Sequence, residues 1–324
     1  MRRREFLGLI LGPAAAWPLR AFAQSQQTPV IGFLNGSSPD GYAPMVNAFR
    51  IGLREAGFVE GQTVQIEFRW ANGEYNKLPQ LAAELLDRHV SVIVANTPAN
   101  LVAKKSTVTV PIVFTTGSDP VAVGLVPNLN HPGGNVTGVS QLNVEVGPKL
   151  VELAHELLPD AKIGLLVNPS NVESQEIVRN TQDAARSLKI FVEVLHADTD
   201  RELESVFAEF SKANGGVLTV ASDAFFFGRT QQLAELARRY AIPTIDQIAA
   251  FTAAGGLMSY GGDVKESYHL AGAYVGRILR GEKPADLPVQ QSTKVELTIN
   301  LKAAKSLGIH VPPSLLARAD EVIE

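Results

Sequence analysis

Hydroxyl and amide side chains follow several apolar runs of this chain, and residues of these types can hold a small polar ligand. In "IVFTTGSDP" the apolar run Ile112-Val113-Phe114 stops abruptly in Thr115-Thr116-Gly117-Ser118-Asp119. Four other apolar runs end in a similar way: Asn35-Gly36-Ser37-Ser38, Asn96-Thr97-Pro98, Asn168-Pro169-Ser170 and Ala221-Ser222-Asp223. Free backbone N–H groups at such turns, together with the hydroxyls, favour an anion such as a carboxylate.

Each of these turns also has a simpler interpretation. Serine, threonine, asparagine and aspartate are good helix N-caps, and for a single turn capping alone explains the sequence. The whole set favours a binding site, because ligands of open parallel sheets bind outside the carboxyl ends of the strands. We therefore predict that these turns line a cleft, and that Asp119 caps the segment that follows it.

Catalytic chemistry is poorly represented. The sequence has no G-x-S-x-G nucleophile elbow, no P-loop, no G-x-G-x-x-G and no cysteine. The six histidines do not have metal-ligand spacing, so we predict no catalytic residue, no metal site and no cofactor. They are His89, His131, His155, His196, His269 and His310. A hydrolase or transferase that uses one of the serines as nucleophile remains an alternative, although no local histidine–acid pattern supports it.

Aromatic and acidic residues near these turns could select the ligand. Tyr42 and Tyr260 could cover an apolar ligand body, as could Phe225-Phe226-Phe227 unless these three pack the start of a helix. Asp223 and Asp246 end predicted strands, and either could pair with a ligand ammonium or simply cap a helix. From the residues alone, both interpretations stay open.

The elements that must position these residues follow an alternating β–α order. The runs "VIVA" and "PIVFT" are continuously apolar, as in parallel strands covered on both faces. In contrast, "VQIEFRW" (64–70) alternates strictly, which predicts a half-buried strand near a sheet edge. The pattern then repeats, since "KIGLLVNPS" resembles "VIGFLNGSS" and "GVLTVASDA" resembles "SVIVANTPA". The chain therefore contains two copies of one α/β unit, each the size of a small domain.

Composition and the first residues indicate an exported globular protein. The formal net charge is -4 over 324 residues, so no large basic field for nucleic acid is indicated. Residues 1–23 have a basic start, a short apolar stretch and the pattern Ala21-Phe22-Ala23, which predict a cleaved export signal. Arg3-Arg4-Glu5-Phe6-Leu7 is also similar to a twin-arginine signal, and both export routes stay open. Without cysteine we expect neither disulfides nor a lipid anchor, and hence a soluble periplasmic protein.

Three segments of the sequence resemble one known family. They are "PIVFTTGSDPVAVGLVPNLNHPGGNVTGVS" (111–140), "AGGLMSYG" (254–261) and the tail that begins "LPVQQSTKVEL" (287–324). They are similar to the ABC transporter substrate-binding proteins, in the branch that includes tryptophan-binding and other aromatic-amino-acid-binding members. The resemblance covers essentially the whole chain after the export signal, and the segment "SDPV…GL…PGGN" is specific to the family.

The resemblance implies an α/β fold, the type I periplasmic-binding-protein fold. Two doubly wound parallel-sheet lobes with three crossovers would close on a ligand between them. We expect residues 28–135 plus 258–285 in lobe 1, and residues 136–257 plus 286–324 in lobe 2. An ABC permease and an ATPase at the inner membrane are the implied partners. We expect a monomer that binds no nucleic acid.

Carried over to this chain, the resemblance places the ligand at the same turns. The implied cleft residues are Ser37, Ser38, Thr97, Thr116, Ser118, Asn168, Ser170, Asp223 and Tyr260. One departure concerns the ligand, because this chain has Ile245-Asp246-Gln247 where relatives often have an aromatic residue and a glutamate. The resemblance therefore implies the role of the protein more clearly than the identity of its ligand.

The predicted function is capture of a small solute and its delivery to an ABC importer. We expect an amino acid or a related small carboxylate, with an aromatic side chain as one option. Its carboxylate would lie at the helix starts after Ser37, Thr97 and Thr116, and its ammonium would pair with Asp223 or Asp246. The alternatives are a neutral solute such as a sugar or nucleoside, a sensor subunit for a signalling receptor, and the enzyme described above.

Overall fold

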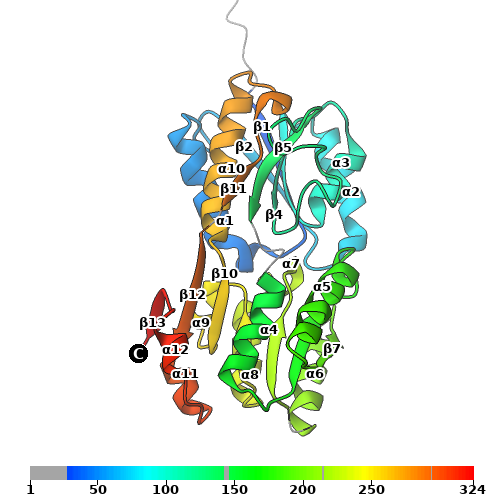
Figure 1. The fold of residues 1–324 in the computed structure, drawn as a ribbon. Helices are drawn as coiled ribbons and strands as arrows, with labels where there is room; N and C mark the ends of the chain where they lie inside the picture. Colours follow the sequence, from blue (N-terminus) through cyan, green and yellow to red (C-terminus); the bar gives the residue numbers. More distant parts are fainter. Residues whose placement is uncertain (1–27, 142–145, 214, 293) are drawn as a thin grey trace, which may run out of the picture.

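The computed structural model describes residues 28–141, 146–213, 215–292 and 294–324, and these residues form two α/β lobes (Figure 1). Each lobe is built on its own sheet, with helices on both faces. Two sheets with interleaved helices confirm the predicted architecture, and the order of the strands decides which turns meet.

Lobe 1 has a six-stranded sheet in which every neighbouring pair is parallel. Its strands are β1 (Val30–Asn35), β2 (Gln65–Trp70), β3 (Val92–Asn96), β4 (Ile112–Thr116), β5 (Val136–Gln141) and β11 (Gln290–Ser292), in the spatial order β11-β5-β4-β3-β1-β2. The continuously apolar β3 and β4 lie inside the sheet and are fully buried, as predicted. The alternating run forms β2, which lies at the edge, and this prediction is also confirmed.

Two pairs of helices cover the two faces of this sheet. The helical elements of lobe 1 are α1 (Pro39–Glu55), η1 (Tyr75–Lys77), α2 (Leu78–Asp87), α3 (Ala99–Ser106), α10 (Val264–Leu279) and η3 (Pro284–Asp286). One core packs α1 and α10 against the sheet, and a second core packs α2 and α3 on the opposite face. The helices α1 and α10 cross closely, because a Cβ on Gly52 would lie 1.9 Å from the carbonyl oxygen of His269.

Lobe 2 has a seven-stranded sheet that is parallel except between β10 and β12. Its strands are β6 (Ile163–Val167), β7 (Val192–His196), β8 (Val217–Val220), β9 (Thr244–Asp246), β10 (Met258–Gly262), β12 (Val295–Asn300) and β13 (Glu321–Ile323), in the spatial order β13-β12-β10-β9-β8-β6-β7. Its helices are α4 (Val146–Leu157), α5 (Ser174–Ser187), α6 (Asp200–Lys212), α7 (Ala224–Phe227), α8 (Thr230–Arg239), α9 (Ala249–Ala253), α11 (Leu301–Ser306) and α12 (Pro313–Leu316). The core under α4 and α5 and the core under α6, α8 and α9 lie on opposite faces.

The chain passes between the lobes three times, after β5, after β10 and after β11 (Figure 1). The lobes therefore differ from the predicted boundaries at these three strands. β5 and β11 belong to lobe 1, although their residues were predicted to lie in lobe 2. β10 belongs to lobe 2, although its residues were predicted to lie in lobe 1. The Pro/Gly segments "PGGN" and "DLPVQQ" are the reason, because they mark where a strand begins, whereas the crossing follows the strand.

The two lobes touch each other closely in this structure. A Cβ on Gly41 of α1 would lie 2.4 Å from the Cα of Gly228, just after α7. The rings of Tyr42 and Phe227 lie 5.8 Å apart, and the hydroxyl of Tyr75 donates to Asp223 at 2.7 Å. Lobe 1 and lobe 2 are therefore closed on each other along α7. No helix of the described residues is long and apolar enough to cross a membrane.

Candidate functional site

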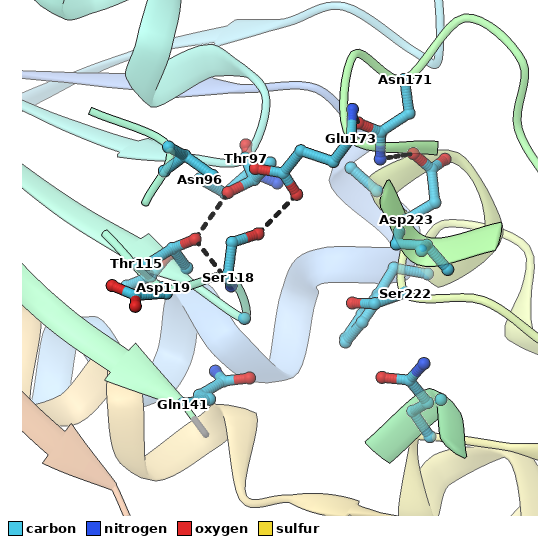
Figure 2. Close-up of a pocket in the computed structure, with 18 of the residues that line it drawn as sticks. Asn96, Thr97, Thr115, Ser118, Asp119, Gln141, Asn171, Glu173, Ser222 and Asp223 are labelled. Carbon is cyan, nitrogen blue, oxygen red and sulfur yellow. Dashed lines mark hydrogen bonds between the residues drawn. The ribbon is translucent and has the colours of Figure 1, made fainter. Parts of the chain in front are cut away.

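A cavity of about 110 Å³ lies between the lobes, at the carboxyl ends of their strands (Figure 2). Lobe 1 lines it with the turns after β3 and β4, the end of β5, and side chains of α1 and α10. Lobe 2 lines it with the turns after β6, β8 and β9 and with α4, α5 and α7. Three of the five strand ends that the sequence predicted as ligand-binding turns, those after β3, β4 and β8, therefore contribute to one cavity.

Three hydroxyls from lobe 1 form a connected group on one wall of the cavity. Thr97 and Thr116 share a hydrogen bond between their Oγ1 atoms at 2.9 Å, and Thr116 Oγ1 also accepts the backbone N–H of Ser118 at 3.1 Å. Asp119 accepts the N–H groups of Val121 and Ala122 through Oδ1, which confirms the predicted cap. This hydroxyl wall offers polar groups to a ligand without any positive charge.

Glu173 reaches across the cavity from lobe 2 to this hydroxyl wall. Ser118 Oγ donates to its Oε2 at 2.5 Å, as Figure 2 shows. Its other oxygen, Oε1, is buried, and no described residue donates to it. Burial raises the pKa of Glu173, and the nearby carboxylates of Glu176 and Asp223 raise it further. An unpaired carboxylate oxygen in this position would accept a bond from a ligand ammonium.

Asp223 is the second buried carboxylate of the site, but the protein itself satisfies it. Its Oδ1 accepts from Asn168 at 2.9 Å, from Tyr75 at 2.7 Å and from the N–H of Phe225 at 2.8 Å. Its Oδ2 accepts from Asn171 at 2.8 Å. Burial raises the pKa of Asp223 and these four hydrogen bonds oppose the shift. Asp223 thus joins both lobes and caps α7, and it has less free acceptor capacity than Glu173.

Aromatic rings form another wall of the cavity. Tyr42, Phe227 and Tyr268 all line it and are buried. The rings of Tyr42 and Tyr268 meet edge to face at 5.8 Å, and Asn96 donates to the hydroxyl of Tyr42 at 3.1 Å. Burial raises the pKa of both tyrosines well above the ordinary value, so both hydroxyls stay protonated. An apolar ligand body would pack against these rings.

Not every residue predicted from the sequence reaches the cavity. Of the eleven, Tyr42, Thr97, Thr116, Ser118 and Asp223 line it. The other six do not, namely Ser37, Ser38, Asn168, Ser170, Asp246 and Tyr260.

The six have other surroundings. Ser37 and Ser38 face Gly228, where the lobes touch, and Asn168 supports Asp223 from behind. Ser170 is exposed and donates to Asp198, and Tyr260 packs against the core of lobe 2. A direct ligand contact for these residues stays a prediction.

Sequence reasoning missed several residues that line the site, and three of them bear on the ligand. Glu173, Gln247 and Tyr268 were not selected because each lies in a helix or beside residues with clearer signals. Asp246 was selected instead of its neighbour Gln247, yet only Gln247 reaches the cavity. Asp246 ends β9, and successive side chains along a strand point to opposite faces of the sheet, so the side chains of Asp246 and Gln247 point in opposite directions. This alternation was the one signal that could have separated the two.

Asp246 lies under the site as a buried and half-satisfied carboxylate. Its Oδ1 accepts the N–H groups of Gln247 at 2.6 Å and Ile248 at 3.0 Å. Its Oδ2 is buried without a partner among the described residues, beside the strand position of Ser259, whose Oγ is unpaired too. Burial raises the pKa of Asp246 to about 7, and the two backbone bonds offset only part of that effect.

Replacing Asp246 by asparagine is expected to make stability less sensitive to pH. A carboxyl whose pKa is raised on folding favours the folded state below its unfolded pKa of roughly 3.9, and this contribution is lost as pH rises toward the raised pKa. In the parent, the free energy of unfolding should therefore fall by up to about 1.4 kcal/mol for each unit that the pH rises between about pH 4 and 7. Urea denaturation of parent and variant at pH 5 and pH 8 measures the difference, and equal changes with pH would contradict the shift.

Comparison with known proteins matches these features to one family. The model of the family "ABC transporter substrate binding protein" matches residues 30–323. A tyrosine-binding protein of Clostridioides difficile (strain R20291) is 29% identical over 260 residues, which cover 79% of this chain and 74% of that protein. The type I periplasmic-binding-protein fold expected from the sequence is shared with solved structures.

Two solved relatives differ in whether a ligand is bound. An ABC domain from Streptococcus pneumonia in complex with L-Trp is 28% identical, covers 92% of this chain and 100% of that chain, and has a TM-score of 0.81. The ligand-free, open structure of a substrate-binding protein with adhesive properties from Clostridium difficile is 26% identical, with coverage of 91% and 99% and a TM-score of 0.61. The TM-score of this chain is thus higher with the ligand-bound relative than with the ligand-free, open one.

Proposed function

This chain belongs to the family of ABC transporter substrate-binding proteins, and from that membership we propose that it binds an aromatic amino acid in the cavity between its lobes. The observation that carries the proposal is the composition of that cavity. Hydroxyls line one side, an unpaired carboxylate oxygen of Glu173 faces them, and three aromatic rings form a further wall. An amino acid has a complementary group for each of the three.

The orientation of the ligand follows from charge. The described residues that line the cavity include four carboxylates and no arginine, lysine or histidine. They are Asp119, Glu173, Glu176 and Asp223. The ligand carboxylate would therefore bind beside Thr97 and Thr116, whose shared hydrogen bond leaves one O–H free to donate, and its ammonium would pair with Oε1 of Glu173. Hydrogen bonds to charged groups contribute about 1.5–3 kcal/mol each, so a few of them support micromolar binding, about -8 kcal/mol, after association costs.

The size of the cavity restricts the ligand further. A volume of about 110 Å³ has room for on the order of ten water-sized groups. A single amino acid has a number of non-hydrogen atoms of this order. A neutral sugar or nucleoside remains the rival ligand, but it would leave the charge of Glu173 unpaired in a closed site, which is unfavourable.

The transport role extends this proposal to partners and location. Substrate-binding proteins of ABC importers act outside the cytoplasm, and members of this family are binding proteins rather than enzymes. We propose periplasmic export through residues 1–23, which lie outside the described residues, and action as a monomer that docks on an ABC permease with its ATPase. Closure of the lobes around the ligand would create the form that docks. A sensor subunit that docks on a receptor would use the same closure.

Ligand binding tests the proposed function directly. We expect L-tyrosine or L-tryptophan to stabilise the purified protein by about 2.7 kcal/mol at a hundredfold excess over its dissociation constant. Thermal unfolding with a panel of amino acids, sugars and nucleosides measures the effect, and calorimetry gives the affinity. Stabilisation by a sugar or nucleoside and by no amino acid would contradict the proposal, and turnover of the bound compound would favour an enzyme.

A further inference from the structure

The turn after β9 places an amide at the side of the cavity away from Glu173. Gln247 lines the cavity and is only 6% exposed. Its Nε2 lies 3.5 Å from the carbonyl oxygen of Val220, whereas its Oε1 is buried and no described residue donates to it. Exchanging the two amide atoms would bring two acceptors together, so the contact with Val220 supports this orientation. Gln247 therefore has an acceptor free for a ligand.

The backbone around Gln247 is held from two sides. Asp246 Oδ1 accepts the N–H groups of Gln247 and Ile248. On the neighbouring strand β10, a Cβ on Gly261 would lie 2.0 Å from the carbonyl oxygen of Gln247, so this close approach requires a glycine. A side chain on such a fixed turn can position its oxygen well enough to discriminate between ligands.

The order of the strands gives the separation of the strand ends from which the turns with Gln247 and Glu173 start. Glu173 follows β6 and Gln247 follows β9, with β8 between these two strands. Neighbouring strands lie about 4.8 Å apart, so the two turns are separated by about 10 Å along the edge of the sheet. An aromatic amino acid whose ammonium pairs with Glu173 can span this distance if a group on its ring completes a hydrogen bond of about 2.9 Å.

We propose that Gln247 is a specificity-determining residue, which accepts a hydrogen bond from an N–H or O–H donor on the aromatic ring of the ligand. This inference rests on the proposed function. Tyrosine carries a phenol O–H and tryptophan an indole N–H, whereas phenylalanine carries neither. A closed site with a buried acceptor discriminates against a ligand that lacks the donor, because the acceptor is then left without a partner.

Calorimetric titration of the three aromatic amino acids tests this role. We expect the parent to bind tyrosine or tryptophan at least about tenfold more tightly than phenylalanine. Gln247→Met keeps the length of the side chain and removes the acceptor, so it should reduce this ratio to about threefold or less and bind phenylalanine no more weakly than the parent. Gln247→Glu retains an acceptor and should keep the preference. Gln141→Met is the matched control, since Gln141 also lines the cavity.

The outcomes separate this inference from the function beneath it. If none of the three amino acids binds, the proposed function is wrong and the inference falls with it. If they bind but phenylalanine binds as tightly as the other two, or if Gln247→Met keeps the parent's ratio, the inference alone is wrong. Loss of the preference in Gln141→Met but not in Gln247→Met would also overturn it. If the methionine variant fails to fold, a parent that binds phenylalanine as tightly as the other two still overturns the inference.

Discussion

Replacing Glu173 by glutamine is expected to weaken binding of an aromatic amino acid by about 10- to 100-fold. Glutamine has the same shape and can still accept from Ser118, but it presents no charge to the ligand ammonium. Hydrogen bonds to charged groups contribute about 1.5–3 kcal/mol, and each 1.4 kcal/mol corresponds to a factor of ten. Calorimetric titration of parent and variant with the ligand that the binding panel identifies measures this loss.

Two other acidic residues provide matched controls for this substitution. Glu176→Gln removes a carboxylate that lines the cavity but is exposed, and Asp246→Asn removes one that is buried outside the cavity. Both are expected to change affinity by less than about threefold, since neither pairs with the ligand. If either control weakens binding tenfold while Glu173→Gln does not, the ammonium partner has been assigned to the wrong residue.

The same residue gives binding a pH dependence with a defined sign. Burial raises the pKa of Glu173, and only the ionised form pairs with an ammonium. Affinity of the parent should therefore fall as pH decreases through this raised pKa, because binding must then remove a proton. Glu173→Gln should lose this part of the decrease. Its affinity would thus change less than that of the parent over the same acidic range.

Replacing Asp223 by alanine is expected to destabilise the protein by at least about 3 kcal/mol. The substitution leaves the side chains of Asn168, Asn171 and Tyr75 without their acceptor, and the N–H of Phe225 keeps only the Tyr75 hydroxyl as a partner. A buried donor without a partner costs about 1–3 kcal/mol, and three such donors are affected together. Urea denaturation followed by circular dichroism measures the change in the free energy of unfolding.

Tyr75→Phe is the graded control for Asp223→Ala. It removes one of the four donors and with it a hydrogen bond between the lobes, at a cost of about 1 kcal/mol. It should also make the lobes open more readily, which small-angle X-ray scattering of the ligand-free protein would detect as a larger radius. Burial of the charged Asp223 carboxylate has a free-energy cost of its own. If Asp223→Ala lowers the free energy of unfolding by less than about 1 kcal/mol, this burial cost cancels the stabilisation from the four hydrogen bonds.

The sequence predicted the types of residue in the binding site better than it predicted which individual residues line the cavity. Thr97, Thr116 and Ser118 were chosen as turn residues after apolar runs, and the structure brings them to one wall of the cavity. Tyr260 was chosen by the same reasoning but packs against the core of lobe 2, while Tyr268 lines the cavity. A turn signal identifies a strand end, but it does not say which faces of the later elements point toward that end.

The sequence by itself determined the local structure and the repeated plan of two α/β units. Continuous apolar runs predicted the buried strands β3 and β4, and strict alternation predicted the edge strand β2, because burial on one or both faces of a sheet dictates these patterns. Only the tertiary structure decided which lobe β5, β10 and β11 join, and which carboxylate stays free. Glu173 meets Ser118 across 55 residues of chain, and such a contact depends on the three crossings and on how the lobes face each other. The local periodicity of the sequence predicts neither the three crossings nor the orientation of the lobes.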